Sequence, residues 1–570
     1  MASRREFLQT AAAAAFPAPL ARAAESVYLA DFDKCLPASA LARGPQPRRW
    51  RLLSYESDNA RGFLLVAGQN TDAPEIRYRF SQKGWHAVSI GLCTLGHLEH
   101  TSVQIRLKSD RTFCVLNHTQ YSKPDARRRI DDFFWKYADV TGEELVIRTL
   151  KRGPVWDGAW IAYLKLTPLS EAEVAEVKRD RARKDTRRLY AHNDAFTYAA
   201  RVGTSTAGEI AREIEPLRDT DFSRLYWEVG DGDNLYYPSK LAPAITGALM
   251  KDPHRLADKL HQESHVAYER NGIHPAKVAI EAAHSLGLEF HACWRPAGFH
   301  YPPPHEDRNP NGLYDQHPEW RSRDRLGRPT PRLSYAYPGV RNFALSMFRE
   351  VAGYPVDGVC LLYNRRPPFL EYEEPVVNSF KKQFGQDPRQ LDERDERWLR
   401  HRAGVMTQFH RDLRAALPRK VQISAIVLAG AQENLYNALD VEGWVREGLV
   451  DTIIPYTNAP RIDSAADSWL DPKDYEFFLR VTRGTSCKMA LSLLPRKMSP
   501  EEYRRRAKMH YDAGVENLFF WDTFERNDFS PSWSALRRLG HREEVGKPLE
   551  RPHSMLRKVG DWDLSYATPG

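Results

Sequence analysis

Short apolar segments alternate with amphipathic segments from about residue 187 onwards. The clearest apolar segment, Val359–Leu362, follows a helical pattern and an Asp-Gly turn and stops at Tyr363-Asn364-Arg365. A short apolar run of this kind is typical of a strand that is buried on both faces of a parallel sheet. Seven further runs share this character and begin at Leu189, Arg224, Leu288, Val421, Thr452, Cys487 and Asn517.

Helical periodicity fills the spaces between these strands. The helix that begins at Pro500 has an N-terminal signal in Ser499 and a C-terminal signal in Gly514. Eight strands that are each followed by a helix predict an α/β fold of the (β/α)8 type, a TIM barrel. The other predicted helices cover Thr204–Leu217, Val340–Ala352, Trp398–Leu417 and Val441–Glu447.

The preceding region, residues 25–170, has a different texture. Runs such as Glu75–Phe80 and Ser102–Leu107 alternate polar and apolar residues with a period of two, which predicts an antiparallel β-sandwich of the carbohydrate-binding type. Trp135, Trp156 and Trp160 lie in or near it, and core packing is favoured over a sugar platform for each. The sandwich either binds glycan or covers a face of the barrel. The predicted organisation continues with a helical linker at 171–186, the barrel at 187–545 and a C-terminal extension at 546–570.

The first 24 residues have the pattern of an export signal. The twin arginine Arg4-Arg5 precedes Phe7-Leu8, an alanine-rich segment and a small-residue cleavage site near Ala24. This order is typical of a twin-arginine signal peptide, so we expect a periplasmic or extracellular protein. No later segment reaches the roughly 20 apolar residues of a membrane helix, and no membrane span is expected.

Composition narrows the class of partner. The net charge of +8 comes from 83 basic and 75 acidic residues that are scattered among one another, so we interpret it as solvation and expect no nucleic-acid partner. The 14 Trp and 25 Tyr residues are more informative, because aromatic faces stack on sugar rings. The oligomeric state is left open.

Six cysteines are spread along the chain without a CxxC pair, so no zinc site is expected. Cys293, Cys360 and Cys487 fall inside predicted strands and are interpreted as free buried thiols. A disulfide between Cys93 and Cys114 is left open, since an oxidising compartment would permit it.

Polar and aromatic groups gather at the C-terminal ends of the predicted strands, where barrel enzymes place their active sites. Amides and carboxylates bind adjacent hydroxyls, and indoles stack on sugar rings, so this set suits a carbohydrate substrate. No nucleotide loop and no HxH or HExxH motif occurs, and we predict neither a cofactor nor a metal. The predicted substrate-binding residues are His192, Asn193, Asp194, Trp294, Arg295, Tyr363, Asn364, Arg365, Tyr456 and Trp521.

Cleavage of a glycosidic bond needs two carboxyl groups, one protonated and one that attacks or activates water. The candidates are Glu228, Glu373 and Asp522. Glu228 follows Tyr226-Trp227, an apolar setting that could raise its pKa, although an ion pair with an arginine is an equal alternative. For Asp522 the rival role is a helix N-cap. Glu373 lies in a proline-bounded loop, and one acid of that loop is expected to reach the mouth.

The segment Arg295–Pro338 is too long for an ordinary loop of a barrel. It holds nine prolines together with aromatic residues and histidines, among them His300 and His305. Long loops of this type are usually functional, and an inserted second domain is the alternative.

Five segments together carry a family resemblance: Tyr226-Trp227-Glu228, Asn311 to Trp320, Leu333 to Arg341, Val356 to Val359, and Glu442 to Asp451. On these segments the chain resembles the glycosyl-hydrolase-like family-10 group of (β/α)8 barrel proteins over about residues 187–540. The resemblance implies an exported protein that acts on glycans, often with an accessory β-sandwich.

The chain also departs from related barrels. The group often carries an Asp where this chain has Tyr363-Asn364, and retaining barrels of the wider clan use Glu after strands four and seven. Strand seven here runs into Leu493-Leu494-Pro495-Arg496, which has no acid. We therefore expect a glycoside hydrolase whose acids come from other strands. The alternatives are a carbohydrate-binding protein without catalysis and, ranked lower, a polysaccharide lyase that uses Arg295, Arg365 and Arg496 against a uronic acid, with Tyr363 or Tyr456 as the base.

Overall fold

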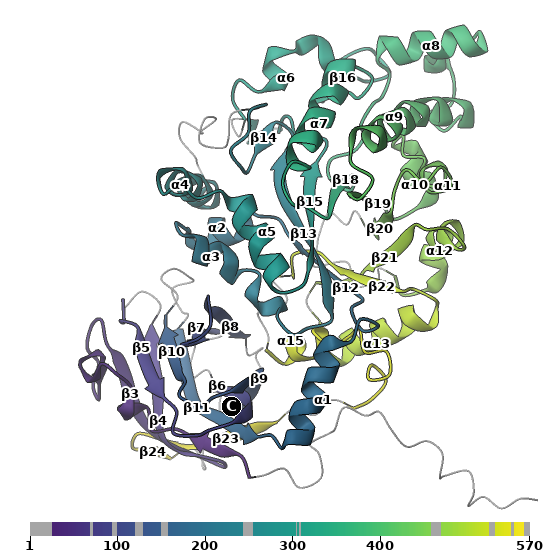
Figure 1. Cartoon of the computed structure of the whole chain (residues 1–570). Coiled ribbons are helices and arrows are strands. Elements are labelled where there is room, and N and C mark those ends of the chain that lie inside the picture. The colour runs from purple at the N-terminus through teal and green to yellow at the C-terminus, as the bar shows by residue number, and fades with distance from the viewer. Residues whose placement is uncertain are drawn as a thin grey trace, which may run out of the picture.

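A barrel and a strand-rich domain lie side by side in the computed structural model of this chain, joined by helix α1 (Glu171–Ala182) (Figure 1). This arrangement confirms the predicted fold class, a TIM barrel with an N-terminal antiparallel sandwich. The structure describes residues 25–68, 72–93, 100–119, 129–149, 158–242, 255–301, 303, 305–306, 309–457, 469–496, 498–523, 530–548 and 552–563.

Eight parallel strands form the barrel. Strand β12 pairs with β13 on one side and with β22 on the other, and this double pairing closes the sheet. All eight begin within three residues of the start of a predicted run, because buried parallel strands read as short apolar runs. The strands are β12 (Leu189–Asn193), β13 (Phe222–Asp231), β15 (Glu289–Arg295), β18 (Gly358–Leu362), β19 (Gln422–Leu428), β20 (Thr452–Tyr456), β21 (Lys488–Ser492) and β22 (Asn517–Phe520).

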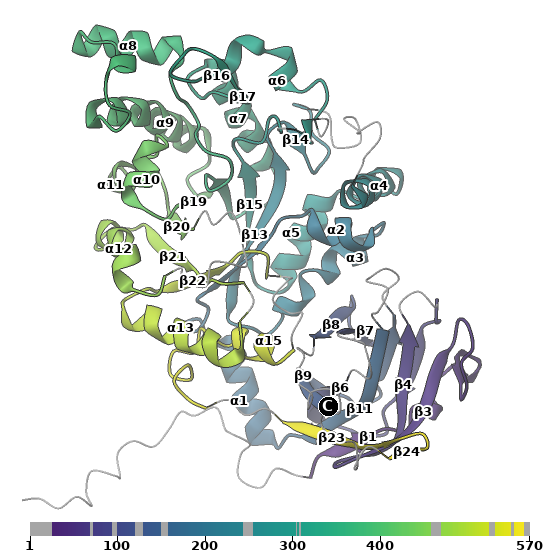
Figure 2. The same cartoon turned by 180° about the vertical axis from the view of Figure 1, so that it is seen from behind.

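Helices surround the barrel on its outside (Figure 2). Four predicted helices are found within two residues of their expected ends, as α7 (Pro338–Val351), α9 (Glu396–Ala416), α11 (Val441–Arg446) and α13 (Pro500–Asp512). The predicted helix Thr204–Leu217 is shorter, because Thr206 caps α3 (Ala207–Arg212) and a 3-10 turn follows at Glu215–Leu217. The remaining helices are α2 (Thr197–Val202), α4 (Leu256–Arg270), α5 (Pro275–Ser285), α6 (Leu313–Gln316), α8 (Glu374–Phe384), α10 (Ala431–Tyr436), α12 (Glu476–Thr482) and α15 (Ser530–Leu536).

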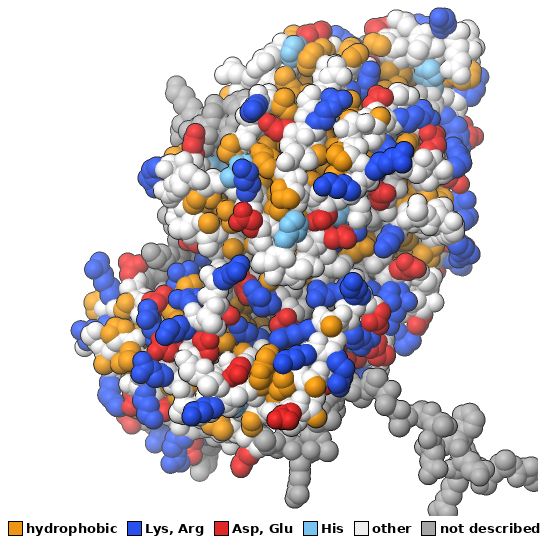
Figure 3. Space-filling view, viewed as in Figure 1, with side chains coloured by type: hydrophobic (Ala, Val, Ile, Leu, Met, Phe, Trp, Pro, Cys, Tyr) orange, Lys and Arg blue, Asp and Glu red, His pale blue; other side chains and the backbone are white. Residues whose placement is uncertain are grey.

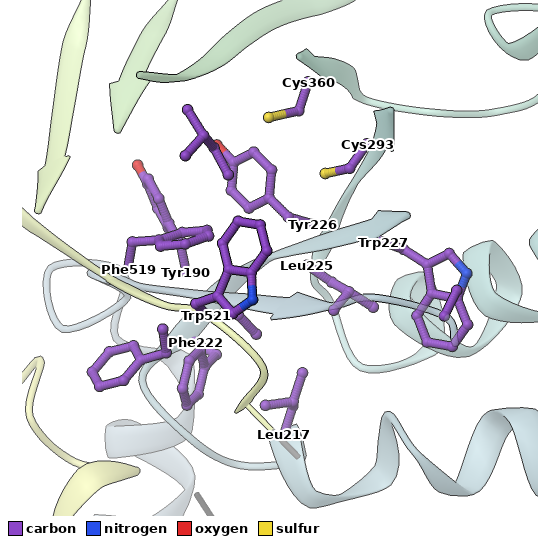
Figure 4. Packing of buried hydrophobic residues seen from close by; sticks show 14 of the residues in the cluster. Tyr190, Leu217, Phe222, Leu225, Tyr226, Trp227, Cys293, Cys360, Phe519 and Trp521 are labelled. Carbon is purple, nitrogen blue, oxygen red and sulfur yellow. The ribbon is translucent and has the colours of Figure 1, made fainter. Parts of the chain in front are cut away.

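Side chains of the barrel strands point alternately into the barrel and toward the helices. Figure 4 shows Tyr226, Cys293 and Cys360 gathered inside the barrel, whereas Trp227 points away from them. The Trp227 ring lies 5.7 Å from that of Tyr198 on α2. This alternation decides which of two neighbouring residues at a strand end reaches the mouth.

The strand-rich domain is a 13-stranded sheet that folds over on itself. Its apolar residues fall into two clusters, so that Leu164 packs in the large core while the adjacent Tyr163 packs in a separate one. The strands of this domain are β1 (Val27–Leu29), β2 (Leu41–Ala42), β3 (Trp50–Ser57), β4 (Arg61–Gly68), β5 (Ile76–Arg79), β6 (Trp85–Leu92), β7 (His100–Leu107), β8 (Cys114–Thr119), β9 (Arg129–Asp139), β10 (Glu144–Arg148), β11 (Gly158–Pro168), β23 (His553–Val559) and β24 (Trp562–Asp563).

The last two of these strands come from the C-terminal end of the chain. Strand β23 pairs with β3 on one side and with β9 on the other, and it is the yellow strand among the purple and blue ones in Figure 1. Leu556 of β23 is buried in the smaller core cluster. Part of the predicted C-terminal extension therefore completes the N-terminal domain.

A buried histidine joins the linker helix to the barrel. His541 Nε2 lies 2.8 Å from Asp180 Oδ1 of α1, and His541 Nδ1 lies 2.7 Å from Asp221 Oδ2, just before β13. Arg537 adds a hydrogen bond from Nη1 to the backbone oxygen of Trp135 in β9, at 3.3 Å. These long-range contacts hold the two parts of the chain together.

The long segment between β15 and α7 forms no separate domain in its described residues. It contains α6 and a two-stranded ribbon, β16 (Arg321–Arg323) and β17 (Pro329–Leu333). Asp233, after β13, ties the segment down by accepting hydrogen bonds from the Asn309 amide and the Leu313 backbone N–H. The segment is thus an elaborate barrel loop.

All six cysteines are buried and free. Cys93 and Cys114 belong to different core clusters, so the disulfide left open above is not formed. Over the described residues, no helix is long and apolar enough to cross a membrane. Basic and acidic side chains are interspersed over the face seen in Figure 3.

Candidate functional site

A buried histidine lies at the centre of the charged groups at the barrel mouth. His192, the fourth residue of β12, is fully buried and its ring stacks on Trp521 with the ring centres 4.0 Å apart. Its Nε2 lies 3.1 Å from Glu228 Oε1 of β13, and its Nδ1 lies 3.4 Å from Asp522 Oδ1 after β22. The imidazole therefore bridges two of the three predicted catalytic carboxylates.

The bridge affects the pKa of His192 and limits the distance between the two acids. Burial alone would lower the pKa of His192, but hydrogen bonds and charge attraction from Asp522 and Glu228 outweigh burial and raise it. Because the acids contact opposite nitrogens of one ring, their nearest oxygens are at most about 9 Å apart. This upper limit does not exceed the roughly 9.5 Å that separates the most distant carboxyl pairs of glycosidases.

Glu228 is held in the ionised form. Burial opposes its charge, but Arg295 and His192 together lower the pKa of Glu228. Arg295 Nε lies 2.6 Å from Glu228 Oε2, and Arg295 Nη2 donates to Oε1 at 3.0 Å, a bidentate geometry. The ion pair with an arginine that the sequence left as an alternative is therefore present.

Asp522 is ionised for a similar reason. Burial would raise its pKa, but His192, Arg496 and Arg365 lower the pKa of Asp522 to about 2. Arg496, after β21, places Nη1 2.5 Å from Asp522 Oδ2 and donates from Nη2 to Tyr456 Oη at 3.4 Å. Asp522 also has a φ of 46°, a conformation that few non-glycine residues adopt and that is concentrated at functional sites.

Asp194 is the carboxyl group of the site that holds a proton most readily. Burial, together with the negative charges of Asp522 and Glu228, raises the pKa of Asp194 to about 6. Its Oδ1 accepts from the backbone N–H groups of Phe196 and Thr197, and its Oδ2 accepts from Thr197 Oγ1 at 2.6 Å. These bonds fix its orientation at the start of α2.

Two neighbouring residues after β18 bring polar groups to the same place. Tyr363 points outward and its hydroxyl lies 2.8 Å from His410 Nε2 of α9. The next residue, Asn364, is buried beside Arg365. The Arg365 guanidinium lies over the Trp521 ring, 4.3 Å from its centre. Both faces of the loop after β18 are thus used, one for packing and one for the mouth.

The structure brings together seven of the residues that the sequence singled out, and a further one, Asn364, is buried next to one of them, Arg365. These seven make direct contacts with one another or with His192, or perturb one another's charge: His192, Asp194, Glu228, Arg295, Arg365, Trp521 and Asp522.

Four predicted site residues have structural partners instead. Trp294 is fully buried, faces Phe348 of α7 and donates from Nε1 to the Gly232 oxygen at 2.8 Å. Tyr363 packs among the helices, and the Asn193 side chain accepts from the Ala195 backbone N–H at 2.8 Å. Glu373 immediately precedes α8 and accepts from Ser322 Oγ at 2.6 Å and from the Arg323 and Glu371 backbone N–H groups. Glu373 therefore anchors the β16–β17 ribbon.

Tyr456 joins the cluster through its contacts with Arg496 and with the Trp521 ring, whose centre is 5.0 Å from its own. Arg496 was named from the sequence only for the lyase alternative and not among the substrate-binding residues of the hydrolase. Its place directly after an apolar strand was the available signal, because every strand end of a closed barrel faces one mouth. Among the described residues, no group of three or more His, Cys, Asp or Glu side chains is arranged to hold a metal ion.

Comparison with known proteins gives one family match, over slightly less than half of the chain. Residues 191–472 match the family model described as glycosyl hydrolase-like 10, which confirms the resemblance found in the sequence. The match contains His192, Glu228 and Arg365 but ends before Arg496 and Asp522. No curated protein sequence matches the chain.

Solved structures resemble this chain distantly. The alpha-L-fucosidase isoenzyme 2 from Paenibacillus thiaminolyticus is 12% identical with a TM-score of 0.41, over 62% of this chain and 49% of that one. A beta-galactosidase from the psychrophilic Marinomonas ef1 is 12% identical with a TM-score of 0.40, over 63% of this chain and 61% of that one. The catalytic domain of beta-amylase from Paenibacillus polymyxa is 12% identical with a TM-score of 0.41, over 63% of this chain and 99% of that one. The chain thus spans about half the length of the fucosidase, and similarity this low carries no inference about activity.

Proposed function

We propose that this chain, whose residues 191–472 match the glycosyl hydrolase-like 10 family, is a glycoside hydrolase that acts on an oligo- or polysaccharide at the barrel mouth. The observation that carries the proposal is the buried bridge of Glu228, His192 and Asp522 beside the protonatable Asp194. A pair of carboxyl groups whose pKa values are pushed apart is what acid–base cleavage of a glycosidic bond requires.

Each carboxyl group has a role in this proposal. Asp194 is the general acid, because below about pH 6 it carries the proton that the leaving oxygen needs. Asp522 is the ionised partner that attacks the anomeric carbon or activates water. Glu228 was one of two candidates for the acid, the other being Glu373, but its ion pair with Arg295 suits it better to raising the pKa of His192.

A carbohydrate-binding protein without catalysis is the second candidate. Its support is that Glu228 and Asp522 are each engaged by an arginine, Arg295 and Arg496 respectively. A carboxylate locked in an ion pair is less free to attack a sugar. Strand β21, the seventh of the barrel, is also followed by Arg496 rather than an acid.

Product release separates the two candidates. Wild type and Asp522→Asn are incubated with plant, algal and microbial polysaccharides and aryl glycosides, and new reducing ends are measured. A hydrolase releases them with the wild type, and Asp522→Asn lowers kcat by about 100-fold or more, the size expected when an acid–base group is removed. Unsaturated products that absorb in the ultraviolet would assign a lyase, and binding without any product would assign a binding protein.

The pH profile tests the role of Asp194. Since the acid must be protonated, kcat/KM falls as the pH rises through about 6. Asp194→Asn removes this limb of the profile together with most of the activity. An unchanged limb in Asp194→Asn would assign the general acid to another group.

Export by the twin-arginine route is part of the same proposal. The support is the Arg4-Arg5 leader, whose residues 1–24 lie outside the described part of the chain. Fractionation of cells that produce the full chain, with Arg4 and Arg5 replaced by Lys as the comparison, tests it. The wild type is expected in the exported fraction and the replaced chain in the cytoplasm.

A further inference from the structure

One cation at the barrel mouth has no anionic partner among the residues that the structure describes. His192, Arg295 and Arg496 each contact a carboxylate of the site. Arg365 forms no ion pair with any carboxylate of the described residues, and its buried Nε has no hydrogen-bond partner among them. Its described contact is with the Trp521 ring, 4.3 Å away.

The surroundings of Arg365 make this charge costly. Burial comes first and repulsion by Arg295 second among the effects that lower the pKa of Arg365, and nearby Asp522 and Glu228 oppose them only in part. A buried charge that is not paired destabilises a fold. Within the described part of the chain, Arg365 therefore lacks a counter-ion, and an anionic ligand could take that place.

Asn364 provides a second and independent observation. It is 1% exposed, and neither the oxygen nor the nitrogen of its amide has a hydrogen-bond partner among the described residues. Buried polar groups are almost always satisfied, so each exception calls for an explanation. Asn364 directly precedes Arg365, which lies over the Trp521 ring of the His192 cluster.

The backbone around the pair is held in place by the neighbouring loop. The Arg366 guanidinium donates to the His300 oxygen and lies over the Tyr301 ring, 4.5 Å from its centre. Arg366 also has a φ of 57°, a conformation that costs free energy in a non-glycine residue. Asn364 and Arg365 are thus presented by a fixed turn, which is what a binding site needs.

We infer that the substrate carries an anionic substituent, a carboxylate or a sulfate on the sugar, and that Arg365 binds this group while Asn364 binds an adjacent hydroxyl or the same anion. The inference rests on the proposed function and specifies its substrate class. The planar guanidinium matches the two oxygens of a carboxylate or sulfate, and its stacking on Trp521 pre-orients the fork. The Asn364 amide offers a donor and an acceptor.

The test is binding, measured by calorimetry on matched glycan pairs. Uronic-acid oligosaccharides are compared with their methyl esters, and sulfated oligosaccharides with their desulfated forms. We expect the wild type to bind at least one anionic member about tenfold or more tightly than its neutral counterpart, and Arg365→Gln to abolish that preference, as for the loss of a charge-assisted hydrogen bond. Loss on esterification assigns a carboxylate, and loss on desulfation assigns a sulfate.

Arg446→Gln is the matched control. Arg446 is the last residue of α11 and is exposed. Its replacement removes one positive charge, as Arg365→Gln does, but should leave the preference for anionic glycans intact. Equal binding of both members of every pair would overturn the inference. So would the absence of binding to every anionic glycan, or an Arg365→Gln variant that weakens neutral and anionic ligands alike. If Arg365→Gln does not fold, the inference is still tested by the wild type alone, through its binding of each anionic glycan and of the neutral counterpart.

Failure of this inference is distinguishable from failure of the proposed function. Binding is measured without turnover, so a charge preference without product from any glycan would retain the anionic ligand and refute the hydrolase. Cleavage of neutral glycans without any preference for anionic ones would retain the hydrolase and refute the anionic ligand.

Discussion

The buried histidine between the linker helix and the barrel should make the stability of this protein depend on pH. His541 is 1% exposed and contacts Asp180 through Nε2 and Asp221 through Nδ1. Burial lowers the pKa of His541, but the hydrogen bonds to both carboxylates outweigh burial and raise it from 6.5 to about 9. The folded state therefore binds the proton more tightly than the unfolded state.

The sign and the size of the effect follow from linkage. Because the pKa is raised on folding, the stabilisation is complete below about pH 6.5 and is lost as the pH rises through about 9. The difference corresponds to about 3 kcal/mol at roughly 1.36 kcal/mol per pH unit. Allowing for partial solvent screening, we expect about 2 kcal/mol.

Urea unfolding of the wild type and His541→Gln checks this expectation. Glutamine keeps hydrogen-bonding groups but not the charge, so near pH 6 the variant should lose about 2 kcal/mol, a shift of roughly 0.5–1 M in the midpoint at an m-value of 2–3 kcal/mol/M. Near pH 10 the two proteins should differ much less. His317→Gln, at a partly exposed loop histidine, controls for the loss of an imidazole. A difference between wild type and variant that is the same near pH 6 and near pH 10 would refute the reasoning.

Two further predictions concern residues whose roles the tertiary structure assigns. Leu556→Ala should lower the free energy of unfolding by about 2–5 kcal/mol, because Leu556 is buried in the smaller core cluster. The urea unfolding midpoint should drop accordingly. Lys558 is exposed on the same strand, so Lys558→Ala should leave the midpoint unchanged. Glu373→Gln should lower the melting temperature, because Ser322 Oγ and the Glu371 N–H donate to this carboxylate, yet product release should persist, unlike in Asp522→Asn. Loss of turnover in a folded Glu373→Gln would return this residue to the catalytic set.

Much of the fold can be read from the sequence, because strand and helix patterns are local. The apolar run at Val359–Leu362 and the signals around Pro500 and Gly514 each depend on a few neighbouring residues. The contribution of β23 to the N-terminal domain could not be read in this way. Strand β23 pairs with β3 and β9, which lie several hundred residues earlier in the sequence, and the residues around β23 do not indicate which strands it pairs with.

The candidate site divides in the same way. The sequence by itself determined that His192, Glu228, Arg365 and Asp522 stand at strand ends, and in a closed barrel every such end faces one mouth. The tertiary structure was needed to show that one imidazole bridges two acids more than 290 positions apart in the chain, and that the pKa of Asp194 is raised while that of Glu228 is lowered. The physical reason is that periodicity belongs to a single segment, whereas charge states and ion pairs depend on which side chains barrel closure brings within a few ångströms and removes from water.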